Sequence, residues 1–94
     1  MIARNHALTT SYAGLAAQTI PSGVRKVEFW GVDAVDAAAG VAIFVKMINA
    51  GGTDYAVIPI AAGATYTHDI ERSSDWTYTI KAAAGTPVAN VVFS

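Results

Sequence analysis

The segment VAIFVKMIN, residues Val41–Asn49, decides the fold. Four of its nine residues are valine or isoleucine, whose β-branched side chains favour a strand over a helix. Successive side chains of a strand point to opposite faces. One face is entirely apolar: Val41, Ile43, Val45 and Met47. The other face is apolar apart from one lysine: Ala42, Phe44, Lys46 and Ile48. We therefore expect a strand that buries side chains on both of its faces.

The rest of the chain follows the same preference, with eighteen valines and isoleucines against two leucines. These residues lie in short runs bounded by Gly, Pro, Asn, Asp and Ser, which is typical of strands joined by turns. Besides 41–49, the runs that predict strands are 15–20, 24–32, 55–61, 65–71, 76–82 and 88–93. The predicted fold class is all-β, a single small antiparallel β-sandwich or jelly-roll-like domain of about seven or eight short strands.

Three places leave alternatives open. Residues 1–12 form an N-terminal arm or an edge strand, and residues 13–94 form the sandwich domain. Asp33–Gly40 forms a loop or a single helical turn, with Asp33 as its N-cap and Gly40 beyond its C-terminal end. Pro59 has no N–H to donate, so the strand at 55–61 is an edge strand, contains a bulge or breaks there.

Composition argues against several classes of partner. The 94 residues make one domain. The net charge is −1 and the six basic residues are scattered, so we expect no nucleic-acid partner. Without cysteine there is no disulfide framework and no thiolate metal site. No segment approaches the ~20 consecutive apolar residues that span a bilayer. Arg4, Asn5 and His6 interrupt the first ten residues, which therefore lack a secretory signal, and we expect a complete product made inside the cell.

The polar residues predict no catalytic or cofactor site. His68 has Asp69 and Glu71 nearby, but the period of two places those carboxylates on the opposite face. His68, Ser73, Ser74 and Asp75 supply the residue types of a hydrolytic triad, yet nearness in sequence is not triad geometry. Asp33 and Asp36 are followed by three alanines rather than by further calcium ligands. Gly51-Gly52 precedes no Lys-Ser/Thr and so is not a phosphate loop. We expect a protein that is not an enzyme and holds no metal or cofactor.

Aromatic residues offer a second class of function. Four of them could line a sugar-binding face: Trp30, Tyr66, Trp76 and Tyr78. Trp76 and Tyr78 are better explained as core residues, because Ile80 continues their face. Trp30 shares the polar face of its strand with the charged residues Lys26 and Glu28, so it is a candidate for contact with a sugar or with a protein partner.

Self-association is the simplest account of the surplus apolar surface. The strand at 88–93 resembles 41–49, with Val88 and Val92 on one face and Ala89, Val91 and Phe93 on the other. A lone antiparallel sandwich needs only one apolar face per strand. The second face must be covered by a folded-over loop or by another subunit, and so short a chain has few residues for loops. Charged residues are also scarce, 14% against the ~25% of an average domain. We therefore expect a homo-oligomer.

One stretch resembles a known class of proteins. Asp54–Ile70, DYAVIPIAAGATYTHDI, contains the step Ile58-Pro59-Ile60, the turn Ala62-Gly63-Ala64-Thr65 and a Thr-rich strand. This element, and the Ala84–Val88 stretch before the last strand, resemble small β-rich structural proteins of tailed bacteriophages. The resemblance implies a virion component made in the host cytoplasm: a head decoration or cement protein, often trimeric, or a small fibre or tail-associated protein. It carries over no catalytic residues.

The sequence thus predicts a capsid decoration or cement protein that stabilises the particle, with a carbohydrate- or protein-binding module as the alternative. The expected partners are further copies of the chain, with a trimer favoured, and the major capsid protein or another virion protein. Seven residues are the candidate interface: Tyr12, Trp30, Phe44, Met47, Ile48, Val91 and Phe93.

Overall fold

Most of the strands form where β-branched and aromatic residues are frequent along the chain. A computed structural model describes residues 2–48, 55–70 and 76–94, and these contain eight strands and one 3₁₀ turn. In chain order they are β1 (Ile2–Ala7), η1 (Tyr12–Gly14), β2 (Gln18–Thr19), β3 (Lys26–Val32), β4 (Ile43–Ile48), β5 (Tyr55–Ile60), β6 (Tyr66–Asp69), β7 (Thr77–Ala82) and β8 (Val88–Phe93).

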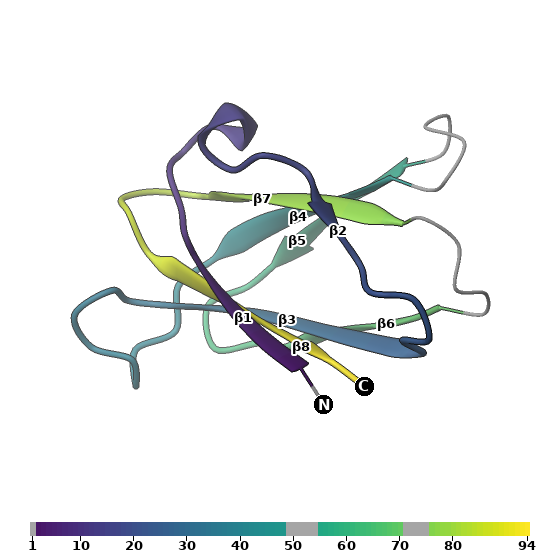
Figure 1. Ribbon diagram of the computed structural model, residues 1–94. Helices are drawn as coiled ribbons and strands as arrows, with labels where there is room; N and C mark the ends of the chain where they lie inside the picture. The colour runs from purple at the N-terminus through teal and green to yellow at the C-terminus, as the bar shows by residue number, and fades with distance from the viewer. Residues whose placement is uncertain (1, 49–54, 71–75) are drawn as a thin grey trace.

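The strands form two antiparallel sheets of four that face each other (Figure 1). Sheet A has the order β1-β8-β3-β6, and sheet B has the order β2-β7-β4-β5. Consecutive strands alternate between the two sheets except where β4 and β5 form a hairpin. An eight-stranded double sheet with this alternation is a jelly roll. The predicted all-β sandwich is therefore confirmed.

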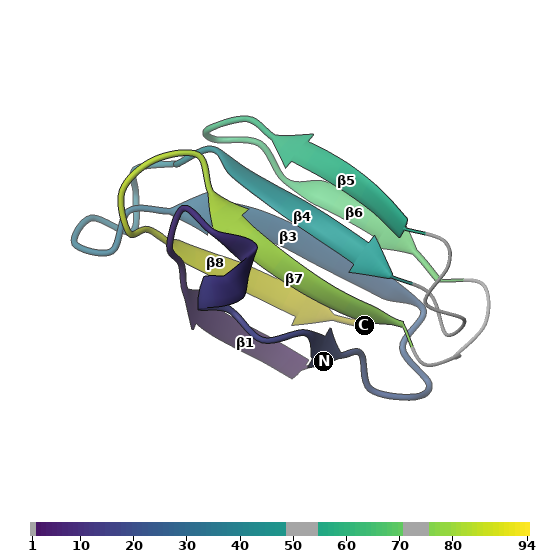
Figure 2. The same cartoon turned by 90° about the horizontal axis from the view of Figure 1, so that it is seen from above.

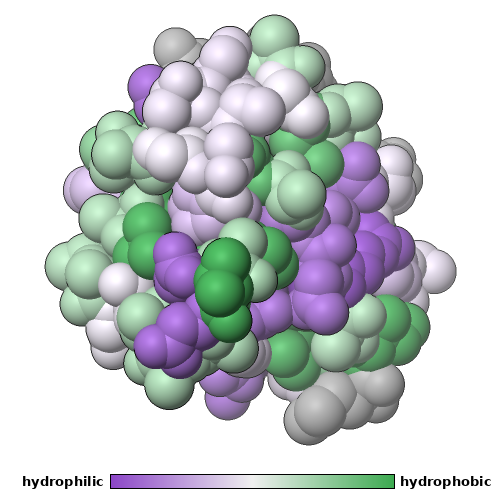
Figure 3. Space-filling model, turned by 90° about the vertical axis from the view of Figure 1, so that its left-hand side faces the viewer, coloured by the Kyte–Doolittle hydropathy of each residue, from purple (hydrophilic) through white to green (hydrophobic). Residues whose placement is uncertain are grey.

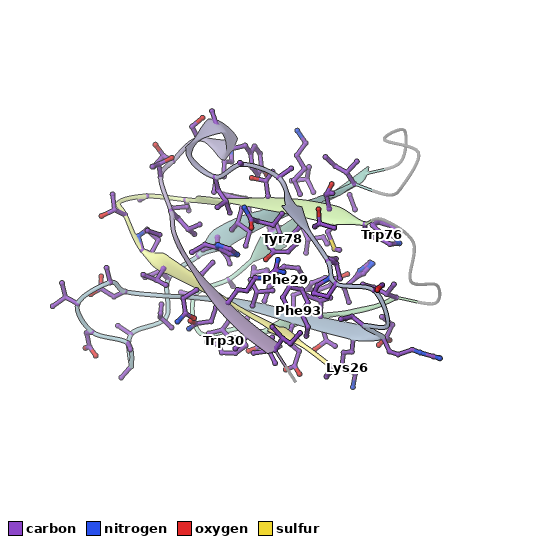
Figure 4. All side chains as sticks on the ribbon, in the orientation of Figure 1. Lys26, Phe29, Trp30, Trp76, Tyr78 and Phe93 are labelled. Carbon is purple, nitrogen blue, oxygen red and sulfur yellow. The ribbon has the colours of Figure 1, made fainter. Side chains whose placement is uncertain are left out.

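The core fills the space between the sheets. Every second residue of the central strands points inward, as in Val27 and Phe29 of β3 or Tyr78 and Ile80 of β7, all with no exposed surface. Figure 4 shows Phe29, Tyr78 and Phe93 meeting between the layers, whereas Trp30 points away from them. Burial of large apolar side chains from both sheets is the main favourable contribution to this fold.

Several expectations are refined by the structure. The strand at 88–93 has the expected bounds, whereas 15–20 yields only the two residues of β2. Residues 33–40 form a loop without a helix, closed by a bridge between Val32 and Gly40. β5 lies at the edge of sheet B, which is where Pro59 is tolerated. β1 lies in the segment expected to be an arm or an edge strand, and it pairs with β8 along all six of its residues at the edge of sheet A.

A crossing segment, residues 9–17, leads from β1 in sheet A to β2 in sheet B. It carries η1 and passes over the outer face of sheet B beside β7 (Figure 2). Thr79 of β7 fixes it there: the Thr79 hydroxyl donates to the Leu15 carbonyl at 2.7 Å and lies 3.4 Å from the Tyr12 carbonyl. Thr79 is 8% exposed, so the segment shields this bond from water.

Thr79→Val should lower the free energy of unfolding by ~1–2 kcal/mol, because it removes the hydroxyl and leaves a shielded carbonyl unpaired. Chemical denaturation measures the change. Thr77→Val is the matched control, since Thr77 lies on the same face of β7 and its replacement breaks no hydrogen bond among the described residues. Equal stability of the Thr79→Val and wild-type proteins would show that the anchor contributes nothing.

Candidate protein interface

Three of the seven candidate interface residues belong to the core. Met47 and Val91 have no exposed surface and Phe93 is 1% exposed. They lie on the inward faces of β4 and β8, where they contact the opposite sheet rather than a partner. Their assignment to the interface was wrong. When both faces of a strand are apolar, the period of two separates the faces but does not say which one points inward.

The other four candidates lie outside the core, on two different surfaces. Phe44 and Ile48 project from the outer face of β4 in sheet B, and the crossing segment brings Tyr12 to the same face. Trp30 projects from the outer face of β3 in sheet A (Figure 4). The structure therefore brings Tyr12, Phe44 and Ile48 to one face and leaves Trp30 on the opposite layer.

The outer face of sheet B combines rings, aliphatic side chains and two ammonium groups. Strand register places Phe44 between Lys81 and Pro59, and places Lys46 between Thr79 and Val57. The Tyr12 ring lies against both lysines, 5.1 Å from Nζ of Lys46 and 4.9 Å from Nζ of Lys81. Nζ of Lys81 also lies 5.4 Å from the Phe44 ring. We call this surface the sheet B patch: Tyr12, Phe44, Lys46, Ile48, Val57 and Lys81.

The contacts around Tyr12 hold the two lysines on the same small surface. An ammonium over an aromatic face is attracted by the ring, worth about 0.5–1 kcal/mol at an exposed site. Burial raises the pKa of Tyr12, and its Oη is buried without a hydrogen-bond partner among the described residues. The phenol therefore stays neutral and does not offset the two positive charges. The patch suits a partner that brings apolar side chains together with carboxylates.

Part of the patch stays open. The crossing segment covers the β7 side of sheet B and leaves the β4–β5 side uncovered (Figure 2). There Val57 is 50% exposed and Pro59 is exposed as well. The folded-over loop that the sequence left as one alternative thus covers only the β7 side of the apolar outer face. Val57 was not among the predicted residues, although its alternation with Ile58 and Ile60 placed it on the outer face of β5.

Trp30 borders a separate hollow on sheet A of about 210 Å³. The other walls are mostly small residues of the 33–40 loop and the 61–65 turn: Gly31, Val32, Ala37, Ala38, Gly40, Gly63, Ala64 and Thr65. Gly40 is required here, because a Cβ on it would overlap the backbone nitrogen of Gly63. The two loops therefore meet backbone to backbone, and Trp30 supplies the one large flat surface.

The remaining aromatic residues do not join Trp30 in a single face. Tyr78 is fully buried, as its shared face with Ile80 predicted. Tyr66 and Trp76 pack against the core around His68. Tyr66 Oη lies 2.9 Å from Nδ1 of His68, and the rings of His68 and Trp76 meet edge to face at 5.6 Å.

The other polar candidates are accounted for locally where the structure describes them. Asp33 and Asp36 accept hydrogen bonds from backbone N–H groups of their own loop. Among residues 2–48, 55–70 and 76–94, no three histidine, aspartate or glutamate side chains are grouped as metal ligands. Gly51-Gly52, Glu71, Ser73, Ser74 and Asp75 lie outside the described residues.

Both histidine side chains, His6 and His68, are partly buried. His6 Nε2 lies 2.8 Å from Tyr78 Oη, and Arg4 nearby reaches the Thr19 carbonyl at 3.0 Å. Burial, and then the charge of Arg4, lower the pKa of His6. Burial lowers the pKa of His68 as well, against a smaller opposing effect of Asp69. Both imidazoles are therefore held neutral below the pH at which an exposed histidine takes up a proton.

Stability should fall as the pH drops below the ordinary histidine pKa of 6.5. The pKa of each histidine is lower in the native state, so below pH 6.5 the unfolded chain takes up protons that the native chain does not. The free energy of unfolding therefore decreases as the pH falls from 6.5 to the native pKa. His6→Gln/His68→Gln should show a smaller drop in melting temperature between about pH 7.5 and pH 5 than wild type. An identical drop in both proteins would contradict the role of the histidines.

Comparisons with known proteins support the fold. No family model matches the chain, and no curated protein matches it. No helix in the described residues has the length and apolar character needed to cross a bilayer. A chain in the crystal structure of Drosophila melanogaster CENP-C bound to CAL1 is similar, with a TM-score of 0.54 at 10% sequence identity. The match covers 98% of this chain and 64% of that one, so this chain spans a little under two thirds of its neighbour's length. At this identity the likeness concerns the fold alone.

Proposed function

We propose that this protein is a structural component of a bacteriophage virion, a homo-oligomeric decoration or cement protein that binds the capsid lattice and stabilises the particle. Its copies associate through the sheet B patch. The protein would be made in the host cytoplasm and would end in the virion, with the major capsid protein or another virion protein as its second partner.

The observation that carries this proposal is the apolar character of the outer faces. The sheet B patch presents Phe44, Ile48 and Val57 outside a core that is already complete. Sheet A adds a second outward group on β3 and β8: Trp30, Val32, Val88 and Val92. Residues of this kind on both layers favour a protein covered on two sides, by its own copies and by another surface.

The resemblance of Asp54–Ile70 to small phage structural proteins points in the same direction. The described part of that stretch, residues 55–70, contains β5, the 61–65 turn and β6, and the two strands lie at the edges of sheets B and A. Jelly rolls are common in viral capsid proteins, although the same architecture also serves lectins and cupins. The fold therefore supports the proposal by analogy, and the patches support it by their chemistry.

The mechanism would be burial of apolar area at repeated joints. Each Å² of apolar surface removed from water contributes ~25 cal/mol before the cost of association is subtracted. One small joint is weak by itself. Joints repeated over a lattice act together, because a copy held at one contact is already close to the next.

Self-association is the first test. Light scattering at micromolar concentration should give a mass that is a multiple of the 9.7 kDa protomer, with the trimer favoured. Phe44→Ser should shift the equilibrium toward the protomer, because it removes apolar area from the sheet B patch. Val88→Ser removes apolar area from the outer face of sheet A and is the matched control. A wild-type protein that remains a protomer would refute the proposal.

The virion assignment is tested on particles. Phage particles produced from a genome that carries this gene should contain the chain in a fixed ratio to the major capsid protein. Particles that lack the gene should assemble but release their genome at a lower temperature. If purified particles do not contain the chain, the virion assignment is wrong.

The hollow beside Trp30 favours one alternative, a carbohydrate-binding module. A pyranose ring can stack on a flat indole, and the small walls let a ligand approach the backbone of the two loops. A hollow of about 210 Å³ has room for one sugar residue.

Trp30→Ala should abolish binding in a glycan array and leave the oligomeric state unchanged, because Trp30 lies outside both the core and the sheet B patch. Trp76→Phe is the control, since Trp76 packs against the core away from the hollow. Glycan binding that survives Trp30→Ala would rule out this site, and no binding by wild type would remove the alternative.

A further inference from the structure

The loop of residues 33–40 projects from one end of the sandwich, beyond the last residues of the sheets (Figures 1 and 2). Val35 in this loop is 96% exposed, more than the other exposed large apolar residues, Ile2 and Val57, which are 50% exposed. Seen toward this end, the surface has strongly hydrophobic patches directly beside hydrophilic ones (Figure 3). A valine side chain this exposed contributes nothing to the stability of the protomer itself.

The loop presents Val35 on a fixed support. Oδ2 of Asp33 accepts the backbone N–H groups of Val35 and Asp36 at 3.1 and 2.9 Å. Oδ1 of Asp36 accepts that of Ala38 at 3.1 Å, and the Asp33 N–H donates to the Ala39 carbonyl at 2.9 Å. A loop held this way loses little conformational freedom on docking, which favours binding.

Its charge is opposite to that of the sheet B patch. The loop carries two carboxylates and no basic residue. The hydrogen bonds above use one oxygen of each carboxylate, so the other oxygen of each can accept a bond from a partner. The sheet B patch carries two ammonium groups and no acidic residue, with exposed Val57 beside Lys46. Both surfaces therefore offer apolar contact, and their charges are opposite.

We propose that the 33–40 loop of one copy docks on the sheet B patch of a second copy, with Val35 against Val57 and Phe44 and with Asp33 and Asp36 facing Lys46 and Lys81. This contact rests on the self-association proposed above and specifies how it occurs. The partner is a second copy because one chain carries both complementary surfaces.

Charge also argues against the simplest alternative, a symmetric pair joined patch to patch. That arrangement would bring four ammonium groups together, and like charges placed against each other at an interface oppose association. Loop-to-patch contact joins two different surfaces. Contacts of that kind close into rings or extend as filaments, and a ring of three copies is one closed solution. Every copy then gives one loop and receives one.

Cross-linking tests this contact cleanly, because the chain has no cysteine of its own. Val35→Cys and Val57→Cys proteins are prepared separately, mixed and oxidised mildly. Docking holds the two thiols at an effective concentration in the ~mM range, so the mixed disulfide should form roughly tenfold or more faster than with a non-docking partner. Thr67→Cys replaces Val57→Cys as the control, because Thr67 is exposed on sheet A away from the patch.

Each outcome has a definite meaning. Fast mixed disulfides with Val57→Cys and slow ones with Thr67→Cys support the contact. Fast disulfides within Val57→Cys protein alone would show patch-to-patch pairing and overturn it. Equal rates for both mixtures would also overturn it, and an oligomer seen by light scattering would then leave the proposed function standing. A protomer in light scattering would remove both.

Charge reversal gives an independent measurement on the same contact. Lys46→Glu/Lys81→Glu should raise the dissociation constant of the oligomer by roughly tenfold or more, and added salt should weaken wild-type association. Val35→Ser should weaken association while the melting temperature of the diluted protomer stays within ~2 °C of wild type, because exposed positions contribute little to stability. If both variants associate like wild type, the contact is elsewhere.

Discussion

Tyr78 joins the two sheets, and the arrangement of both outer faces depends on it. Its ring comes from the central strand β7 of sheet B and meets Phe29 of β3 edge to face at 5.4 Å. Phe93 of β8 lies 6.2 Å from the same ring. Large aromatic side chains interlocked in this way contribute ~0.5–1.5 kcal/mol per pair beyond their burial. The hydroxyl of Tyr78, buried with the ring, reaches His6 of the edge strand β1. A single side chain thus connects four strands of the jelly roll.

Because side chains alternate along a strand, fixing the inward residues also fixes the outward ones. With Tyr78 and Ile80 inside, Thr79 and Lys81 must face outward, where Thr79 holds the crossing segment and Lys81 meets Tyr12. The same rule on β3 turns Trp30 outward once Phe29 is buried. The composition of the candidate surfaces therefore follows from the packing of the core. A substitution that changed the register of β7 would remove the sheet B patch together with the core.

The sequence predicted those parts of the structure that depend on local alternation. It gave the bounds of β8, the outward position of Trp30 and the core position of Tyr78, because each follows from a period of two. It failed where long-range pairing decides. β1 has no apolar alternation and is held by β8, eighty residues later in the chain. The place of Tyr12 between two lysines likewise depends on the path of the crossing segment, which no local pattern encodes.

The order of strands in sheet A has a consequence for synthesis. β8 is the last of the described strands to be synthesised, yet it lies between β1 and β3 rather than at an edge. Until the ribosome has released Phe93, β1 has no neighbour to pair with and β3 keeps one edge unsatisfied. Unpaired edges of this kind attract other strands. All four strands of sheet B are synthesised before β8, so sheet B can form first. The nascent chain would then remain an incomplete sandwich until the six residues of β8 have been synthesised.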